Sequence, residues 1–124
     1  MKALQWMLPV LVLCSWVLAA PGAAQVDYPE EMAQVVAQYP DSTVEMAMKM
    51  QQGTQVMLHT KDEPKKVFAF YKEALSGDGW ESQMEMAQEE GIQGHWVKGD
   101  RMMHVMVTQD EGETAVMLML GKQQ

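Results

Sequence analysis

Apolar residues recur in this chain with two different periods, and the change between the two marks its elements. Between residues 62 and 80 they follow helical spacing and form one stripe, made of Val67, Phe70, Tyr71, Ala74 and Leu75. On both sides of this stretch they alternate every second residue, which is typical of strands. The pattern therefore predicts one amphipathic helix within a β-rich chain.

Both ends of this helix carry recognisable signals. Asp62 is a suitable N-cap, because its carboxylate can accept a hydrogen bond from a free amide of the first turn. Pro64 falls in that first turn, where its missing N–H costs nothing. Gly77 and Gly79 tolerate a positive φ and predict the end of the helix, after which Trp80 begins the next strand.

The remaining mature chain reads as strands after a lead-in at residues 25–42, which contains a short helix-like pattern at 25–40. Strands are expected at residues 43–51, 54–60, 81–87, 95–98, 101–108 and 114–120. The element order is then (α)ββαββββ. This order predicts a two-layer α+β domain over residues 43–124, with an antiparallel sheet of five to six strands and one main helix on one face.

Residues 1–24 have the features of a secretory signal peptide. Lys2 supplies the positive start, an apolar run follows, and Gly22-Ala23-Ala24 forms a small-residue cleavage site. Cleavage predicts a periplasmic or secreted protein with no membrane insertion, whereas an uncleaved segment would serve as an anchor. Cys14 is the only cysteine and Leu13 before it does not fit a lipobox. Removal of the segment leaves no thiol for disulfides, metal sites or nucleophilic catalysis.

Charge and motif content exclude several function classes. All 17 acidic residues follow Gln25, against eight basic ones once Lys2 is removed, so the mature net charge is −9. Such a surface repels nucleic acid and anionic lipid. No phosphate loop, nucleophile elbow or catalytic triad pattern is present. We therefore predict a protein that is not an enzyme and has no catalytic residues. The main hypothesis also assigns it no cofactor.

Methionine is the outstanding feature of the composition. The chain has 14 methionines, and only Met1 and Met7 precede Gln25, so 12 remain in the mature part. In two predicted strands they alternate with polar residues, which favours their use as flexible core fillers. This core assignment covers Met46, Met48, Met50, Met84 and Met86.

In three other strands both faces are apolar. If the branched residues face the helix, the second face of the sheet carries a set of methionines and histidines without a cover. This set is Met57, His59, Met102, His104, Met106, Met117 and Met119. A patch of this kind requires a cover, a partner or a ligand.

Three interpretations of the second face remain open. In the first, the second face is covered, either by the lead-in, which contains Met32, Val35, Val36 and Tyr39, or by a second copy of the chain or an envelope protein partner. Alternatively, thioethers and imidazoles bind Cu(I) or Ag(I), with copper as the cofactor and Met57, His59, Met102, His104 and Met106 as ligands. Thirdly, methionine serves as an oxidation sink or adaptable surface. The main hypothesis is non-enzymatic binding or assembly in the cell envelope.

A resemblance supports export. Tyr39-Pro40, then Thr60-Lys61-Asp62-Glu63-Pro64 with Val67, Phe70-Tyr71 and Leu75, then Gly79-Trp80, resembles a pattern of small exported bacterial proteins. In that pattern YP opens the domain and TxDxPxxVxxFYxxxLxxxGW forms its centre. The resemblance covers most of residues 39–108. It implies an exported α+β domain and transfers no active site.

Overall fold

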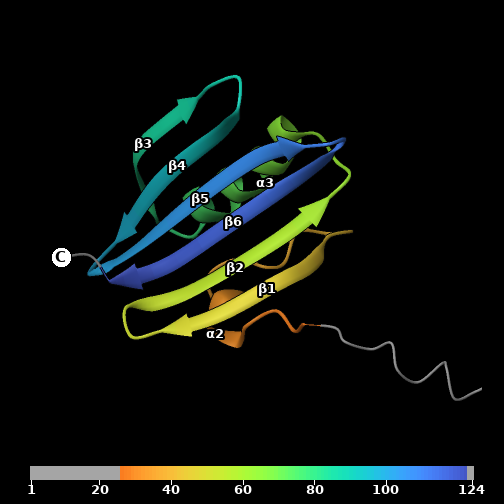
Figure 1. The fold of residues 1–124 in the computed structure, drawn as a ribbon. Helices are drawn as coiled ribbons and strands as arrows, with labels where there is room; N and C mark the ends of the chain where they lie inside the picture. Colours follow the sequence, from red (N-terminus) through yellow and green to blue (C-terminus); the bar gives the residue numbers. More distant parts are fainter. Residues whose placement is uncertain (1–25, 123–124) are drawn as a thin grey trace, which may run out of the picture.

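A computed structural model of the chain describes residues 26–122, so the signal peptide predicted at 1–24 lies outside the described residues. The described chain forms one sheet with helices on one side (Figure 1). The elements in chain order are α2 (Glu30–Ala33), β1 (Thr43–Met50), β2 (Gly53–Thr60), α3 (Pro64–Gly77), β3 (Glu81–Ala87), β4 (Gly91–Lys98), β5 (Arg101–Asp110) and β6 (Glu113–Lys122).

The sheet is antiparallel throughout and has the spatial order β1-β2-β6-β5-β4-β3. The α+β class with one main helix is thus confirmed, and the expected order along the chain is matched in outline. β4 begins at Gly91, four residues before the expected start, because residues 91–94, expected to lie between two strands, pair with β5. The C-terminal strand β6 lies at the centre, while β1 and β3 form the edges.

The helix α3 starts differently from the prediction. It begins at Pro64, its N-cap is Glu63, and no side chain caps it, so the assignment of Asp62 as the cap is wrong. Asp62 instead accepts a hydrogen bond from the Tyr39 hydroxyl at 2.6 Å. Its carbonyl accepts another from the Thr114 hydroxyl, also at 2.6 Å. Asp62 therefore connects the lead-in and β6 at the start of the helix.

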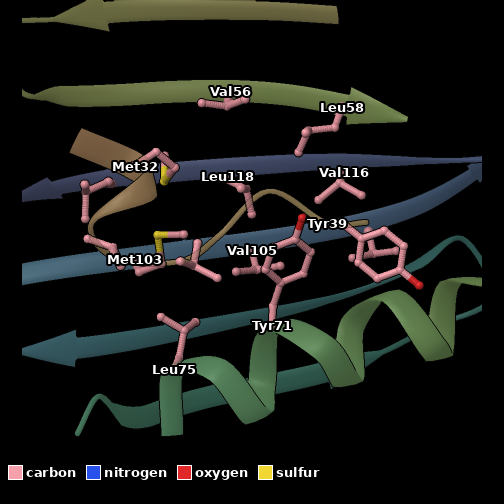
Figure 2. Packing of buried hydrophobic residues seen from close by; sticks show 14 of the residues in the cluster. Met32, Tyr39, Val56, Leu58, Tyr71, Leu75, Met103, Val105, Val116 and Leu118 are labelled. Atoms are coloured by element: carbon pink, nitrogen blue, oxygen red, sulfur yellow. The ribbon is translucent and has the colours of Figure 1, made fainter. Parts of the chain in front are cut away.

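The core lies between α3 and the sheet. The buried positions of the sheet alternate along β2, β5 and β6, and Figure 2 shows several of them facing the helix. From the helix, Val67, Phe68, Tyr71 and Leu75 are buried. Trp80 and Trp96 are also buried. Burial of this apolar area provides the main stabilisation of the fold.

The lead-in packs on the same side of the sheet as α3. Met32, Val36 and Tyr39 are buried in the same cluster as the helix residues, and Met32 and Tyr39 project into it in Figure 2. The Tyr39 ring meets that of Phe70 edge to face, with 5.0 Å between centroids. The expectation that this segment covers the second face of the sheet is therefore wrong. It extends the helix layer, because α3 alone spans only part of a six-stranded sheet.

No helix within residues 26–122 is long and apolar enough to cross a membrane.

A methionine-rich face of the sheet

The face of the sheet opposite α3 gathers most of the methionines of the chain. Figure 1 shows this side toward the viewer, with α3 behind the sheet. Side chains at paired positions of a ladder point to the same face, so the register assigns each strand residue to one side. We call this side the methionine face; its methionines are Met46, Met48, Met50, Met57, Met84, Met86, Met102, Met106, Met117 and Met119. Only Met32 and Met103 of the described methionines are fully buried in the core.

Five of these methionines contradict the core assignment made from sequence. Met46, Met48 and Met50 on β1, and Met84 and Met86 on β3, lie on the open face. Four of the five expose 37% or more of their surface, and Met46 is half-buried. The cause is a one-residue irregularity in each edge strand, between Val44 and Met46 and between Ser82 and Met84. A single extra residue moves every later side chain of a strand to the other face.

Two neighbouring rows of side chains cross the centre of the methionine face, perpendicular to the strands. The histidine row runs through paired positions from β3 to β1: Met84, His95, His104, Met119, Gln55 and Met48. The methionine row lies beside it: Met86, Gln93, Met106, Met117, Met57 and Met46. A hydrogen bond from the Gln55 amide to the Met117 sulfur, at 3.2 Å, connects the two rows. Neither row contains a carboxylate or a lysine.

His95 and His104 are neighbours in the histidine row. They are directly opposite one another on β4 and β5, with ring centroids 5.8 Å apart. Partial burial, and to a lesser extent the nearby His95, lower the pKa of His104 below its ordinary value. His104 is therefore a neutral imidazole at neutral pH, and one of its nitrogens has a free lone pair.

The structure separates the histidines that the sequence suggested as one metal set. His104 lies between Met102 and Met106 along β5, as expected. Met57 lies on β2, opposite Met117 of β6, and is therefore two strands away from His104. His59 lies near the end of β2, opposite Ala115. Its Nδ1 is 3.2 Å from a carboxylate oxygen of Glu113. His59 is thus paired with a carboxylate outside the histidine row.

Sequence reasoning missed His95 as a member of this site. A signal for it existed in the turn between β4 and β5. The two residues Gly99 and Asp100 connect the strands, and a two-residue turn pairs Lys98 with Arg101. Counting back three positions on each strand places His95 opposite His104.

Comparison with known proteins gives one match. Residues 40–113, more than half of the chain, match the START domain-like family. The chain belongs to this family. No curated protein and no solved structure matches it significantly. Membership describes a small α+β domain of a ligand-binding type. The matched stretch includes α3, β1–β5 and both histidines of the histidine row.

In this START domain-like domain two hollows lie at the margins of the sheet. One of about 360 Å³ lies between the start of α3 and the β3–β4 turn, lined by Pro64, Ala87 and Ile92 together with charged side chains. Another of about 450 Å³ lies at the far end of β1, β2 and β6. Both are bordered by exposed charged residues. Among residues 26–122, no group of three or more His, Cys, Asp or Glu side chains is placed to hold a metal ion. The methionine face therefore has the most distinctive chemistry of the described surface.

Proposed function

We propose that the protein is a non-enzymatic binding and assembly domain of the cell envelope, and that the methionine face is its binding surface. The observation that carries the proposal is the face itself. Ten methionines from five strands lie on one side of the sheet, and the helices pack on the other side. Contiguous apolar patches of more than a few hundred Å² on soluble domains mark interaction sites.

The size of the face suits a protein partner. Six strands spaced about 4.8 Å apart, with three rows of outward side chains about 7 Å apart, cover roughly 500 Å² in projection. Protruding thioethers raise the accessible area toward the roughly 800 Å² that each partner buries in a stable complex. Methionine also suits such a surface, because its unbranched thioether adapts to the shape of what it contacts.

The distribution of charge restricts contact between two copies of the chain to the methionine face. With a mature net charge of −9, two copies repel each other over most of their surface. The two central rows hold no carboxylate, whereas Glu45, Glu81 and Glu113 lie at the margins. Contact through the methionine face keeps the charges at the rim, and a two-fold axis places the same surface on both sides.

The location in the envelope is supported by sequence alone. Residues 1–24 have the pattern of a signal peptide, and the central pattern resembles small exported bacterial proteins. Export also fits the absence of cysteine after the cleavage site.

Light scattering of the purified protein over a range of concentrations tests the dimer. We expect the mass of two chains for the natural sequence, and one chain for Met57→Glu, which places a charge within the methionine row. An unpaired charge buried in an interface costs about 2–5 kcal/mol, so the dissociation constant should rise at least about 30-fold. The matched control is Ala69→Glu, which adds the same charge to the exposed side of α3. It should remain dimeric. A natural protein that stays monomeric at all concentrations contradicts the proposal.

A further inference from the structure

We infer that the histidine row is a binding site for a soft monovalent metal ion, Cu(I) or Ag(I), with His95, His104 and Met119 as its ligands. The inference rests on the proposed function, because it requires the methionine face to be a binding surface, and it names a ligand for one part of that face.

The first argument is the placement of the three side chains. His104 occupies the middle position, with His95 opposite it on β4 and Met119 opposite it on β6. Directly opposed residues of an antiparallel pair have Cβ atoms about 4.5–5.5 Å apart, so all three side chains reach a point above β5. The His95 and His104 centroids are 5.8 Å apart. Two metal–nitrogen bonds of about 2 Å each, plus the distance from each nitrogen to its ring centre, span such a separation.

The second argument is the chemistry of the donors. Thioether sulfur selects soft ions such as Cu(I), and imidazole also suits copper. Hard ions such as Ca²⁺ and Mg²⁺ require oxygen ligands, and neither row offers a carboxylate. Met102 and Met106 flank His104 at the next outward positions of β5. They provide further sulfur close to the same point.

The third argument is that the remaining histidine of the face lies outside the site. The Nδ1 of His59 contacts a carboxylate oxygen of Glu113 outside both rows, near the end of β2 and the start of β6. Of the metal set suggested by the sequence, this geometry keeps His104 and replaces His59 with His95 and Met57 with Met119.

Retention of Cu(I) against the chelator bicinchoninate, under anaerobic conditions with ascorbate, tests the site on the purified protein. We expect one equivalent of copper per chain. His95→Gln, His104→Gln and Met119→Leu should each weaken retention at least about tenfold, because each removes one ligand while preserving the volume of the side chain. Two matched controls should stay within about twofold of the natural protein. His59→Gln removes the histidine outside the row, and Met50→Leu removes a thioether of the methionine face that lies outside both rows, at the end of the edge strand β1.

Addition of Ag(I), which needs no reductant, provides a second readout by NMR. The imidazole signals of His95 and His104 should shift together, while those of His59 stay in place. Equal copper loss in the control variants, or no retention against the chelator, overturns the site.

The oligomeric state separates failure of the metal site from failure of the proposed function. Met57→Glu, two strands away from His104, should lose the dimer and keep copper. His104→Gln should lose copper and keep the dimer. A dimeric natural protein that retains no copper refutes the metal site alone. A copper-binding natural protein that is monomeric refutes the dimer alone.

Discussion

Val44 and Met46 are two residues apart in β1, yet their side chains lie on opposite faces of the sheet. Val44 is buried against the core and pairs with Leu58, whereas Met46 pairs with Met57 on the open face. Glu45 between them is the extra residue of a bulge. Because of this one residue, the three methionines of β1 join the methionine face instead of the core.

The same device operates at the opposite edge of the sheet. Ser82 pairs with Trp96 on the core side, while Met84 pairs with His95 on the open side. The skipped residue here is Gln83. In both edge strands, side chains before the bulge alternate between the two faces in one phase, and side chains after the bulge alternate in the opposite phase. Bulges in edge strands also protect a sheet against pairing with further strands.

Deletion of single residues in β1 tests the role of Glu45. Without Glu45, Met46 directly follows Val44, and regular alternation retains the present faces. We expect this variant to fold and to lose less than about 1 kcal/mol of unfolding free energy, measured by urea denaturation. Deletion of Ala47 instead moves a methionine, either Met46 or Met48, into its position against the core. That variant should lose about 2 kcal/mol or more through overpacking. Equal losses in the two variants would contradict the assigned bulge.

Oxidation by hydrogen peroxide distinguishes the two environments of methionine. Met48, Met50, Met84 and Met86 expose 37–44% of their surface in the single chain, so we expect them to form sulfoxides first in the folded Met57→Glu variant, whose methionine face is not covered by a second copy. Met32 and Met103 are fully buried, so their oxidation should await unfolding. Peptide mass spectrometry after timed peroxide treatment measures each site, with a urea-unfolded sample as the control. Oxidation of Met103 at the rate of Met48 in the folded protein would show that the two faces are wrongly assigned.

These edge strands mark the limit of prediction from sequence. The core side of β2, β5 and β6 and the open position of Met117 and Met119 follow from unbroken periodicity. The predicted helix stripe is correct for Val67, Tyr71 and Leu75. Phe70 and Ala74 are only partly buried, and Phe68 is buried instead. Periodicity does not reveal a bulge, so it predicts the wrong face for the methionines of β1 and β3. The pairing of His95 with His104 was accessible through the two-residue turn that joins their strands. The position of the lead-in depends on how much of the sheet α3 leaves uncovered, which no local pattern reveals.

The hydrogen bond from Tyr39 to Asp62 supports the start of α3. Tyr39→Phe removes a 2.6 Å bond to a half-exposed carboxylate and should cost about 1–2 kcal/mol of unfolding free energy. The control is Lys66→Met, which removes the exposed ion pair of the same carboxylate, at 3.8 Å. It should cost less than about 0.5 kcal/mol. A larger loss from Lys66→Met than from Tyr39→Phe would contradict this assignment.

The same hydroxyl predicts a dependence on alkaline pH. Burial, and then the hydrogen bond and charge of Asp62, raise the pKa of Tyr39 to about 12. The unfolded chain has a tyrosine pKa of about 10, so the contribution of Tyr39 is fully present below pH 10 and is lost as pH rises toward 12. Burial also raises the pKa of Tyr28 and Tyr71, so stability should still decline in Tyr39→Phe, but less steeply. Urea unfolding at pH 8 and pH 11 measures both slopes, and identical slopes would contradict the role of Tyr39.

Gly94 and Trp96 form a close contact that permits only glycine at position 94. A Cβ atom at Gly94 would lie 2.5 Å from Cη2 of Trp96 and 3.0 Å from Cζ of Phe68. We expect Gly94→Ala to cost about 1–3 kcal/mol of unfolding free energy, because the indole is fully buried and has no room to move. Gly77→Ala is the control, since its Cβ meets nothing within 4 Å at the end of α3. It should stabilise the protein by about 0.5 kcal/mol.

A double-mutant cycle assigns the cost to the indole itself. Trp96→Phe removes the outer ring atoms that a new Cβ would strike, together with a buried Nε1 that has no hydrogen-bond partner among the described residues. In this background Gly94→Ala should cost less than about 1 kcal/mol, although Trp96→Phe alone is destabilising because it leaves a cavity. Strict additivity of the two substitutions would show that Gly94 is needed for its backbone and not for its contact with Trp96.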